Sequence, residues 1–142
     1  MNAFPSPSRV VLAEDNLADI HLVREALEEH QVRCDLRVVS DGEEMLRFIN
    51  ELDLDNGDPC PDLLLLDLGL PKYSGREILQ HLRASKKCSR VPVVVMTSSD
   101  WRKDMELAET HAGVQYFRKP STLAEFLHLG GLVKNMIEGV AK

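Results

Sequence analysis

The amino-acid sequence predicts a doubly wound α/β fold in which helices cover both faces of one parallel sheet. Short apolar runs alternate five times with longer segments whose apolar residues recur at helical spacing. The leucines at residues 63–66 form a continuous run between turn-forming prolines and glycines. Continuous apolar strands of this kind are typical of parallel sheets, because both of their faces are buried.

The first strand–helix unit is expected in the first thirty residues. Residues 8–14 (SRVVLAE) predict a strand, and apolar residues at helical spacing then predict a helix over about residues 17–30. Either Asp15 or Asn16 can cap the amino end of this helix, because both side chains carry an oxygen that accepts backbone N–H groups.

The second and third units follow the same pattern. Residues 33–39 predict the second strand, after which Asp41 opens a helix that precedes a polar loop at residues 53–61. Residues 62–67 predict the third strand, and the apolar stripe that follows it predicts a helix over about residues 74–86.

The last part of the chain is expected to complete the sheet. The remaining elements are expected at residues 91–97 (strand), 101–111 (helix), 114–117 (strand) and 121–138 (helix). Ser121 is expected to cap the last helix. Gly130 and Gly131 lie inside it and cost about 1 kcal/mol each relative to alanine, so either tight packing or a break is expected near Gly130.

Length and charge narrow the class of protein. A chain of 142 residues, with 44% hydrophobic and 28% charged residues, is expected to form one compact domain without a separate sensor or output module. Its net charge of −6 argues against direct DNA binding, which needs a basic surface to neutralise phosphates.

The cysteines and the amino terminus favour a cytoplasmic protein. Cys34, Cys60 and Cys88 show neither CxxC nor Cys/His spacing, so neither a disulfide framework nor a zinc site is indicated and reduced thiols are expected. Residues 1–8 lack the features of a signal peptide, and no apolar stretch is long enough to span a membrane.

Polar residues follow the ends of four expected strands. Glu14 and Asp15 follow the first, Asp67 ends the third, Thr97 ends the fourth and Lys119 lies just past the fifth. The carboxyl ends of parallel strands share one edge of the sheet, and ligands bind at that edge in open α/β sheets. Three carboxylates gathered there repel one another, and oxygen ligands without His or Cys select Mg²⁺.

Phosphoryl transfer fits this set of side chains. The negative charge on a transferred phosphoryl group would be stabilised by a metal ion, by a lysine such as Lys119 and by a hydroxyl donor such as Thr97. Asp67 would supply the nucleophile, since a carboxylate can form an acyl phosphate. Each residue alone also suits an ordinary role in a turn, a helix cap, a strand or the solvent, and only the whole set indicates chemistry.

The chain resembles the receiver domain of two-component response regulators over about residues 9–138. The matching positions are Glu14-Asp15 (the acidic pair), Asp67 in LLLLDLGLPKYSG (the phosphoacceptor), Thr97 (the switch hydroxyl) and Lys119-Pro120 (the lysine–proline pair). The separations of 30 residues from Asp67 to Thr97 and 22 from Thr97 to Lys119 are also typical of receivers. The segments PVVVMTSS and LPKYSGREIL are most similar to those of stand-alone receivers that pair with bacterial phytochrome kinases.

The resemblance implies a flavodoxin-like (βα)5 sandwich of three layers, with a five-stranded parallel sheet of order 2-1-3-4-5. It also implies a metal site. Asp15 and Asp67 would bind Mg²⁺ directly, together with the main-chain carbonyl of Gly69, and Glu14 would act through water.

The resemblance assigns further roles around the phosphoryl group. Thr97 and Lys119 would contact it, and the bond from Lys119 to Pro120 is expected to be cis, an isomer that only X–Pro bonds adopt readily. Tyr116 matches an aromatic residue whose rotation reports phosphorylation. Its alternative is an ordinary half-buried tyrosine of a strand.

The function implied is that of a stand-alone response regulator, with the receiver at residues 9–140 after a tail at residues 1–8. It would take a phosphoryl group onto Asp67 from a sensor histidine kinase, of phytochrome type by the subfamily resemblance, or exchange it with a histidine phosphotransfer protein. Such a receiver promotes its own phosphorylation and dephosphorylation but is not a turnover enzyme. Output would pass to a partner protein by conformational change.

The expected signalling face comprises the fourth helix, the fifth strand and the fifth helix, and it could also bind a second copy of the chain. Its apolar residues exceed what one core-facing stripe requires. They are Leu123, Phe126, Leu127, Leu132, Val133, Met136 and Ile137. Ordinary core packing is the alternative.

Gly69 departs from the polar side chain that receivers often carry two residues after the acceptor. Together with the small Ser99, it predicts an open site and a short-lived phosphoaspartate.

Two other classes of protein compete with the receiver as interpretations of the sequence. A haloacid dehalogenase-type hydrolase would need an acid at residue 69, and an interaction module that is never phosphorylated would be expected to lack Asp67 or Lys119.

Overall fold

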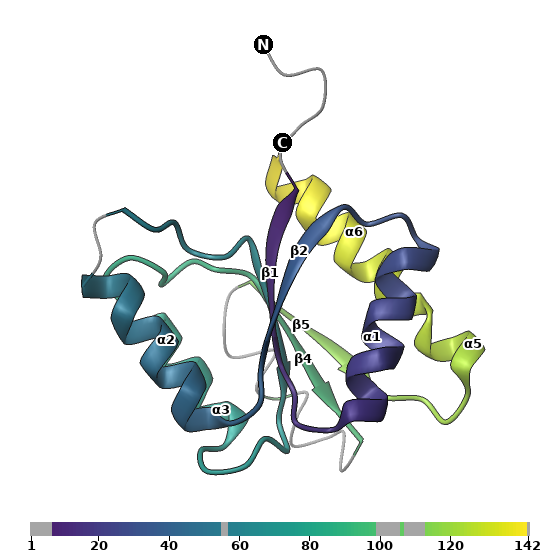
Figure 1. Ribbon diagram of the computed structural model, residues 1–142, viewed down its shortest axis with the longest axis horizontal. Helices are drawn as coiled ribbons and strands as arrows, with labels where there is room; N and C mark the ends of the chain where they lie inside the picture. The colour runs from purple at the N-terminus through teal and green to yellow at the C-terminus, as the bar shows by residue number, and fades with distance from the viewer. Residues whose placement is uncertain (1–6, 55–56, 99–105, 107–112, 142) are drawn as a thin grey trace.

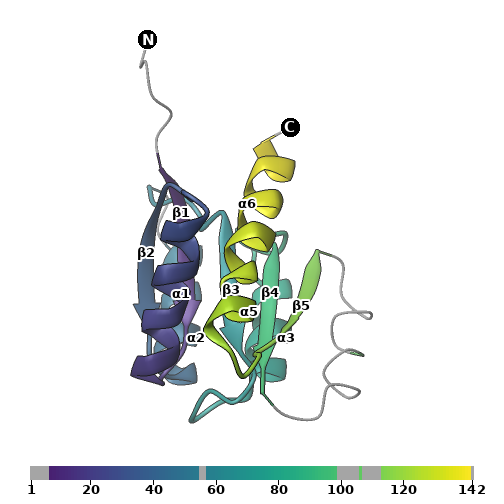
Figure 2. The same cartoon turned by 90° about the vertical axis from the view of Figure 1, so that its right-hand side faces the viewer.

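The computed structural model describes residues 7–54, 57–98, 106 and 113–141. Five parallel strands form one sheet of order β2-β1-β3-β4-β5, with helices on both of its faces (Figures 1 and 2). The strands are β1 (Ser8–Ala13), β2 (Cys34–Val39), β3 (Leu63–Asp67), β4 (Val93–Thr97) and β5 (Val114–Arg118). The helices are α1 (Leu17–Glu29), α2 (Gly42–Leu54), α3 (Gly75–Arg83), α5 (Leu123–Phe126) and α6 (His128–Ala141). The predicted doubly wound fold and strand order are confirmed.

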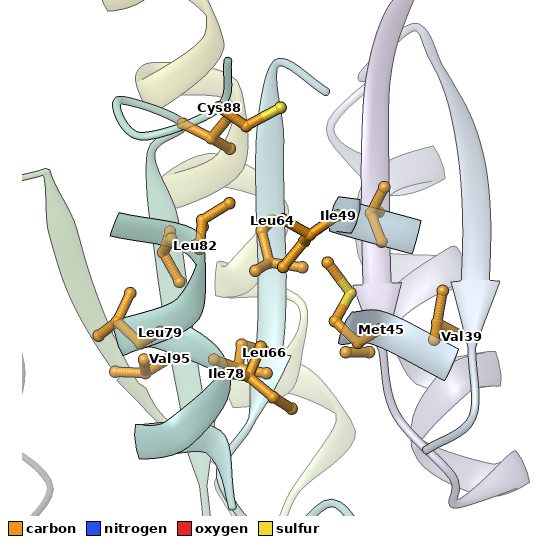
Figure 3. Close-up of a cluster of buried hydrophobic side chains, with 14 of the residues drawn as sticks. Val39, Met45, Ile49, Leu64, Leu66, Ile78, Leu79, Leu82, Cys88 and Val95 are labelled. Carbon is orange, nitrogen blue, oxygen red and sulfur yellow. The ribbon is translucent and has the colours of Figure 1, made fainter. Parts of the chain in front are cut away.

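A hydrophobic core lies between the sheet and helices α2 and α3 (Figure 3). Alternate residues of the central strands contribute to it, because successive side chains of a strand point to opposite faces. Its buried side chains include Val39, Met45, Ile49, Leu64, Leu66, Ile78, Leu79, Leu82 and Val95.

A second core fills the opposite face of the sheet, beneath α1, α5 and α6. Its buried side chains include Val23, Ala26, Leu27, Leu63, Leu65, Met96, Phe126, Leu129 and Val133. Every residue of β3 and β4 is therefore buried, as the continuous apolar runs predict. Because both faces of β3 and β4 are covered, these strands are held firmly in the sheet. Asp67 and Thr97 are their last residues and therefore lie at the same carboxyl edge of the sheet.

Side-chain caps begin two of the helices where the sequence predicts. The Asn16 side chain accepts the Asp19 amide at 3.0 Å at the start of α1. Ser74 and Glu77 form a reciprocal capping box at the start of α3. Each cap pairs amides that have no partner within the helix, which explains the sharp start of both elements.

The last helix differs from its prediction at its cap. Thr122, not Ser121, caps it, because the Thr122 hydroxyl accepts the Glu125 amide. A break is present near Gly130, as expected, since the helix divides into α5 and α6 at Leu127, three residues before Gly130. Gly130 itself provides the close packing, since a Cβ there would collide with the Ala26 carbonyl of α1. None of the helices in the described ranges is long and apolar enough to cross a bilayer.

Two expectations fall on residues that the structure does not describe. The predicted helix at residues 101–111 lies outside the described residues, except for Glu106, which is helical. Ser99, expected at the flank of the site, also lies outside them.

The expectation of reduced thiols is wrong for two of the cysteines. Cys60 and Cys88 form a disulfide, and Cys34 is free. The loop that precedes β3 and the loop that follows α3 meet beside the amino ends of the central strands, which brings two cysteines 28 residues apart to a Cα–Cα distance of 5.6 Å. Spacing along the chain could not show this approach. Nearby, Asp53 at the end of α2 joins this helix to the loop after α3, because it accepts the Ser85 hydroxyl at 2.6 Å and the Lys87 amide at 3.1 Å.

Candidate functional site

The polar residues predicted to gather at the carboxyl ends of the strands do so. Glu14 and Asp15 follow β1 and Asp67 ends β3, and one oxygen from each carboxylate lies within 4.8 Å of the others. Lys119 follows β5 and reaches this cluster. All five strands run in one direction, so these residues share one edge of the sheet (Figure 1).

Main-chain hydrogen bonds beyond the strand ends fix the site. The Glu14 amide donates to the Val39 carbonyl at 2.9 Å, and the Lys119 amide donates to the Thr97 carbonyl at 2.8 Å. These bonds continue the pairing of neighbouring strands by one residue. The backbone beneath Glu14 and Lys119 is therefore part of the sheet, and only their side chains are left to move.

Asp67 lies at the mouth of the fold with little exposed surface. It is 7% exposed, its Oδ1 accepts the Gly69 amide at 2.9 Å, and its Oδ2 lies 3.5 Å from Lys119 Nζ. A Cβ at Gly69 would lie 3.5 Å from Oδ1, at ordinary contact distance. The backbone at Gly69 thus has space for a side chain that would lie beside the carboxylate.

Lys119 is the central cation of the site. Its Nζ lies 2.9 Å from Glu14 Oε2 and 2.8 Å from Asp19 Oδ2, in addition to its longer contact with Asp67. Burial alone would lower the pKa of this amine. Hydrogen bonds to Asp19 and Glu14 and the charge of Asp67 outweigh burial, so its pKa lies above the ordinary value and the ammonium stays charged.

Glu14 is fully buried and holds its proton more tightly than an ordinary glutamate. Burial, followed by a hydrogen bond with Asp67, raises its pKa to about 7, against the opposing effects of Lys119 and the Asn16 amide. Burial is thus the largest cause of the raised pKa of Glu14, and the neighbouring Asp67 adds to it. A divalent cation would offset the negative charge of the three neighbouring carboxyl groups, which are a donor set that suits hard cations. The residues present therefore fit a metal ion held by Glu14, Asp15 and Asp67.

Asp19 is a site residue that sequence reasoning missed. The predicted site residues follow strand ends, whereas Asp19 lies in the first turn of α1. Acids are common in a first turn because they complement the helix dipole, so its presence there carried no functional signal. The one hint in the sequence is that Asp19 follows soon after Glu14 and Asp15. The turn after β1 leads directly into α1, so the first turn of α1 lies near the carboxyl edge of the sheet.

Thr97 and Tyr116 lie on neighbouring strands, β4 and β5. Thr97 is 3% exposed at the end of β4. Tyr116 is half-buried on β5, where it packs against the core under α2 and α3 with its hydroxyl oxygen buried.

The bond from Lys119 to Pro120 is trans, so the expected cis isomer is wrong. An X–Pro bond prefers trans by about 0.5–1 kcal/mol unless tertiary contacts select cis.

Core packing accounts for most of the apolar residues of the last two helices. Phe126 and Val133 are buried, and four others are partly buried against the core. These four are Leu127, Leu132, Met136 and Ile137. Leu123 alone among the seven is freely exposed, at 50%. The described residues thus favour the core-packing alternative for all but Leu123.

Comparison with known proteins identifies the family. The model of the response regulator receiver domain matches residues 10–129. Response regulator Rcp1 of Synechocystis sp. is 36% identical over 99 residues, which are 70% of this chain and 67% of that protein. The phosphorylated cyanobacterial phytochrome response regulator RcpA superposes with a TM-score of 0.81 at 30% identity, covering 96% of this chain and 98% of RcpA. The Mn²⁺-bound form of Rcp1 gives a TM-score of 0.77 at 32% identity, with 91% and 93% covered. The chain therefore belongs to the response regulator receiver family, and the relatives that it resembles include receivers of phytochrome signalling.

Proposed function

We propose that the chain is the phosphoacceptor of a two-component phosphorelay, in which Asp67 takes a phosphoryl group from the phosphohistidine of a sensor kinase. One observation carries this proposal: the Asp67 carboxylate lies at the carboxyl edge of the sheet, 3.5 Å from the Lys119 ammonium and within 4.8 Å of two further carboxylates. The receiver would extend over residues 9–140, with residues 1–8 as a tail, which agrees with the family match at residues 10–129.

The side chains divide the transfer between them. Asp67 Oδ2, on the side of Lys119, forms the new bond to phosphorus while the bond from phosphorus to the histidine nitrogen breaks and the imidazole departs with its electron pair. Lys119 neutralises charge on the phosphoryl oxygens, and the Thr97 hydroxyl donates to one of them. The Gly69 amide holds Oδ1 and so orients the carboxylate.

The carboxylates would hold Mg²⁺ as expected from the sequence. Asp15 and Asp67 would be its direct ligands with the Gly69 carbonyl, and Glu14 would act through water. When bound, the ion would supply positive charge that offsets the negative charge of the carboxylates and of the phosphoryl oxygens. The Mn²⁺-bound form of Rcp1 supports a divalent ion in a related receiver.

Signalling would follow from the new charge on Asp67. Thr97 moves toward the phosphoryl group and Tyr116 follows, which changes the surface near β5 and α5. A phytochrome-type histidine kinase, or a histidine phosphotransfer protein, would be the donor partner, as the likeness to RcpA suggests. A second copy of the chain could bind the same face, where Leu123 is exposed. In this role the protein modifies itself and does not turn over a substrate.

The two competing classes receive no support. The hydrolase lacks its second acid, since residue 69 is glycine. An interaction module without phosphorylation has no need of Lys119 beside Asp67, and the two side chains are 3.5 Å apart.

Intact mass spectrometry tests the proposal. Wild type and Asp67→Asn are incubated with phosphoramidate, with and without Mg²⁺, and beryllofluoride binding is followed in parallel. We expect one Mg²⁺-dependent phosphoryl group on wild type and none on the variant. Absence of both phosphorylation and beryllofluoride binding in wild type would contradict the proposal.

A further inference from the structure

We propose that Asp19 is a positioning residue that holds Lys119 in the unphosphorylated protein and releases it when a phosphoryl group arrives on Asp67. The inference rests on the proposed function. Asp19 Oδ2 lies 2.8 Å from Lys119 Nζ, whereas the distance from Nζ to Asp67 Oδ2 is 3.5 Å. In this structure Lys119 is therefore bound more closely to α1 than to the acceptor.

The neighbouring carboxylates and a phosphoryl group would compete for the Lys119 ammonium, because it has a limited number of N–H donors. An ammonium has three N–H groups, and two of them serve the short bonds to Glu14 and Asp19. A phosphoryl group on Asp67 adds oxygens that need the same donors. The Lys119 main chain is fixed by its bond to the Thr97 carbonyl, so the change must fall on the side chain. One N–H is left for the phosphoryl oxygens, so a second donor from Lys119 to them requires one of the two short bonds to be released.

Burial decides which bond is released. The Glu14 side chain is 0% exposed, so bulk water cannot readily replace the ammonium as its hydrogen-bond partner. The Asp19 side chain is 24% exposed, so water can replace the ammonium there. Release of Asp19 is the less costly of the two.

Asp19 is built to stay in place when Lys119 leaves it. Its amide donates to the Asn16 side chain at 3.0 Å, which anchors the first turn of α1. The Asn16 amide in turn donates to Glu14 Oε1 at 3.1 Å. The amino end of the helix also stabilises the Asp19 carboxylate. Asp19 thus acts as a fixed counter-charge and competes with the phosphoryl group for a mobile lysine.

Removal of this competitor should strengthen binding of a phosphoryl analogue. Beryllofluoride is titrated at saturating Mg²⁺ and followed by fluorine NMR. We expect Asp19→Asn and Asp19→Ser each to bind it about fivefold more tightly than wild type, which is the order expected of one partly exposed ion pair. Asp19→Glu keeps the carboxylate and should restore the wild-type affinity. Glu25→Gln is the matched control, because it removes a charge from the same helix, where the Glu25 carboxylate contacts the exposed His21 at 3.0 Å.

The same Asp19 substitution in a Lys119 variant shows whether Asp19 acts through Lys119 or through a general effect of its charge. In Lys119→Gln, the Asp19→Asn change should alter affinity by less than about 1.5-fold, because Asp19 acts through Lys119 and coupled residues are not additive. The same gain in both backgrounds, or no gain in either Asp19 variant, would overturn the inference. If wild type binds no beryllofluoride and accepts no phosphoryl group, the proposed function fails first. If wild type binds beryllofluoride but the Asp19 substitutions do not change its affinity, the role of Asp19 is refuted and the proposed function is not.

Discussion

At the residue scale, Lys119 connects parts of the chain that are far apart in sequence. Its ammonium joins Glu14, 105 residues away, to Asp19, 100 residues away, and lies beside Asp67. These contacts hold the cation charged in a buried place, where an unpaired charge would be costly. The same contacts set the initial state from which phosphorylation must draw Lys119 away.

Gly69 gives a prediction about the lifetime of the phosphoaspartate. A side chain at this position would lie beside Asp67, since a Cβ there is 3.5 Å from Oδ1 and the backbone is not in the left-handed region. Gly69→Asn should therefore shield the acyl phosphate from water and lengthen its half-life severalfold. The measurement is loss of the phosphoryl mass with time, with Gly69→Ala as the control for bulk alone. A wild-type half-life equal to or longer than that of Gly69→Asn would refute the open-site account.

Asp53 gives a prediction about stability and pH. The hydrogen bond from Ser85, aided by the Lys87 amide and opposed by partial burial, lowers its pKa below the ordinary 3.8. A lowered carboxylate pKa stabilises the folded protein above the unfolded-state pKa, and this contribution is lost as pH falls through the folded-state value.

Asp53→Asn should therefore be less stable than wild type near neutral pH, and the difference should shrink in acid. Urea unfolding of both proteins across this range measures it. A difference that stays constant down to the acid limit would show that the charge of Asp53 does not contribute.

At the element scale, α6 is held against α1 by a glycine contact. The Cβ of an alanine at Gly130 would collide with the Ala26 carbonyl, which belongs to helix backbone and cannot yield easily. Gly130→Ala should therefore lose about 1–3 kcal/mol of unfolding free energy, in spite of the better helix propensity of alanine.

Gly139→Ala is the matched control, because it makes the same change in the same helix where nothing lies within 4 Å. It should leave stability unchanged or raise it by up to about 1 kcal/mol. Urea unfolding compares the two variants. Equal effects would show that the contact at Gly130 is not close enough to matter.

At the scale of the whole molecule, the carboxyl ends of the strands carry the candidate site, and the amino ends lie beside a stabilising disulfide. The carboxyl edge gathers the charged residues of the site, whereas the Cys60–Cys88 disulfide lies at the amino edge. A bond that closes a loop over a separation of 28 residues should stabilise the fold by about 3–4 kcal/mol.

Cys60→Ser with Cys88→Ser should lose stability of this order yet accept phosphoryl groups at the wild-type rate, because the bond is remote from the site. Thiol titration of the unfolded, unreduced wild type should find one free thiol, that of Cys34. Three titratable thiols would contradict the disulfide.

The sequence predicts those features of the molecule that follow from order along the chain. Asp67 and Lys119 each lie at the end of a strand, and parallel pairing alone brings strand ends together. Asp19 and the disulfide depend instead on how a helix turn and two loops approach in space, which periodicity does not encode. The bond to Pro120 is trans, which is the intrinsic preference of an X–Pro bond; whether tertiary contacts would override that preference is equally absent from the periodicity of the sequence.

Every role proposed for the site depends on phosphorylation of Asp67, and chemical trapping tests this directly. Protein treated with phosphoramidate and Mg²⁺ is reduced with borohydride, which converts an aspartyl phosphate to homoserine, and is then digested and sequenced by mass spectrometry. We expect homoserine at position 67 alone, and only when both phosphoramidate and Mg²⁺ are present. Reduction at Asp15 or at another carboxylate, with Asp67 unchanged, would contradict it.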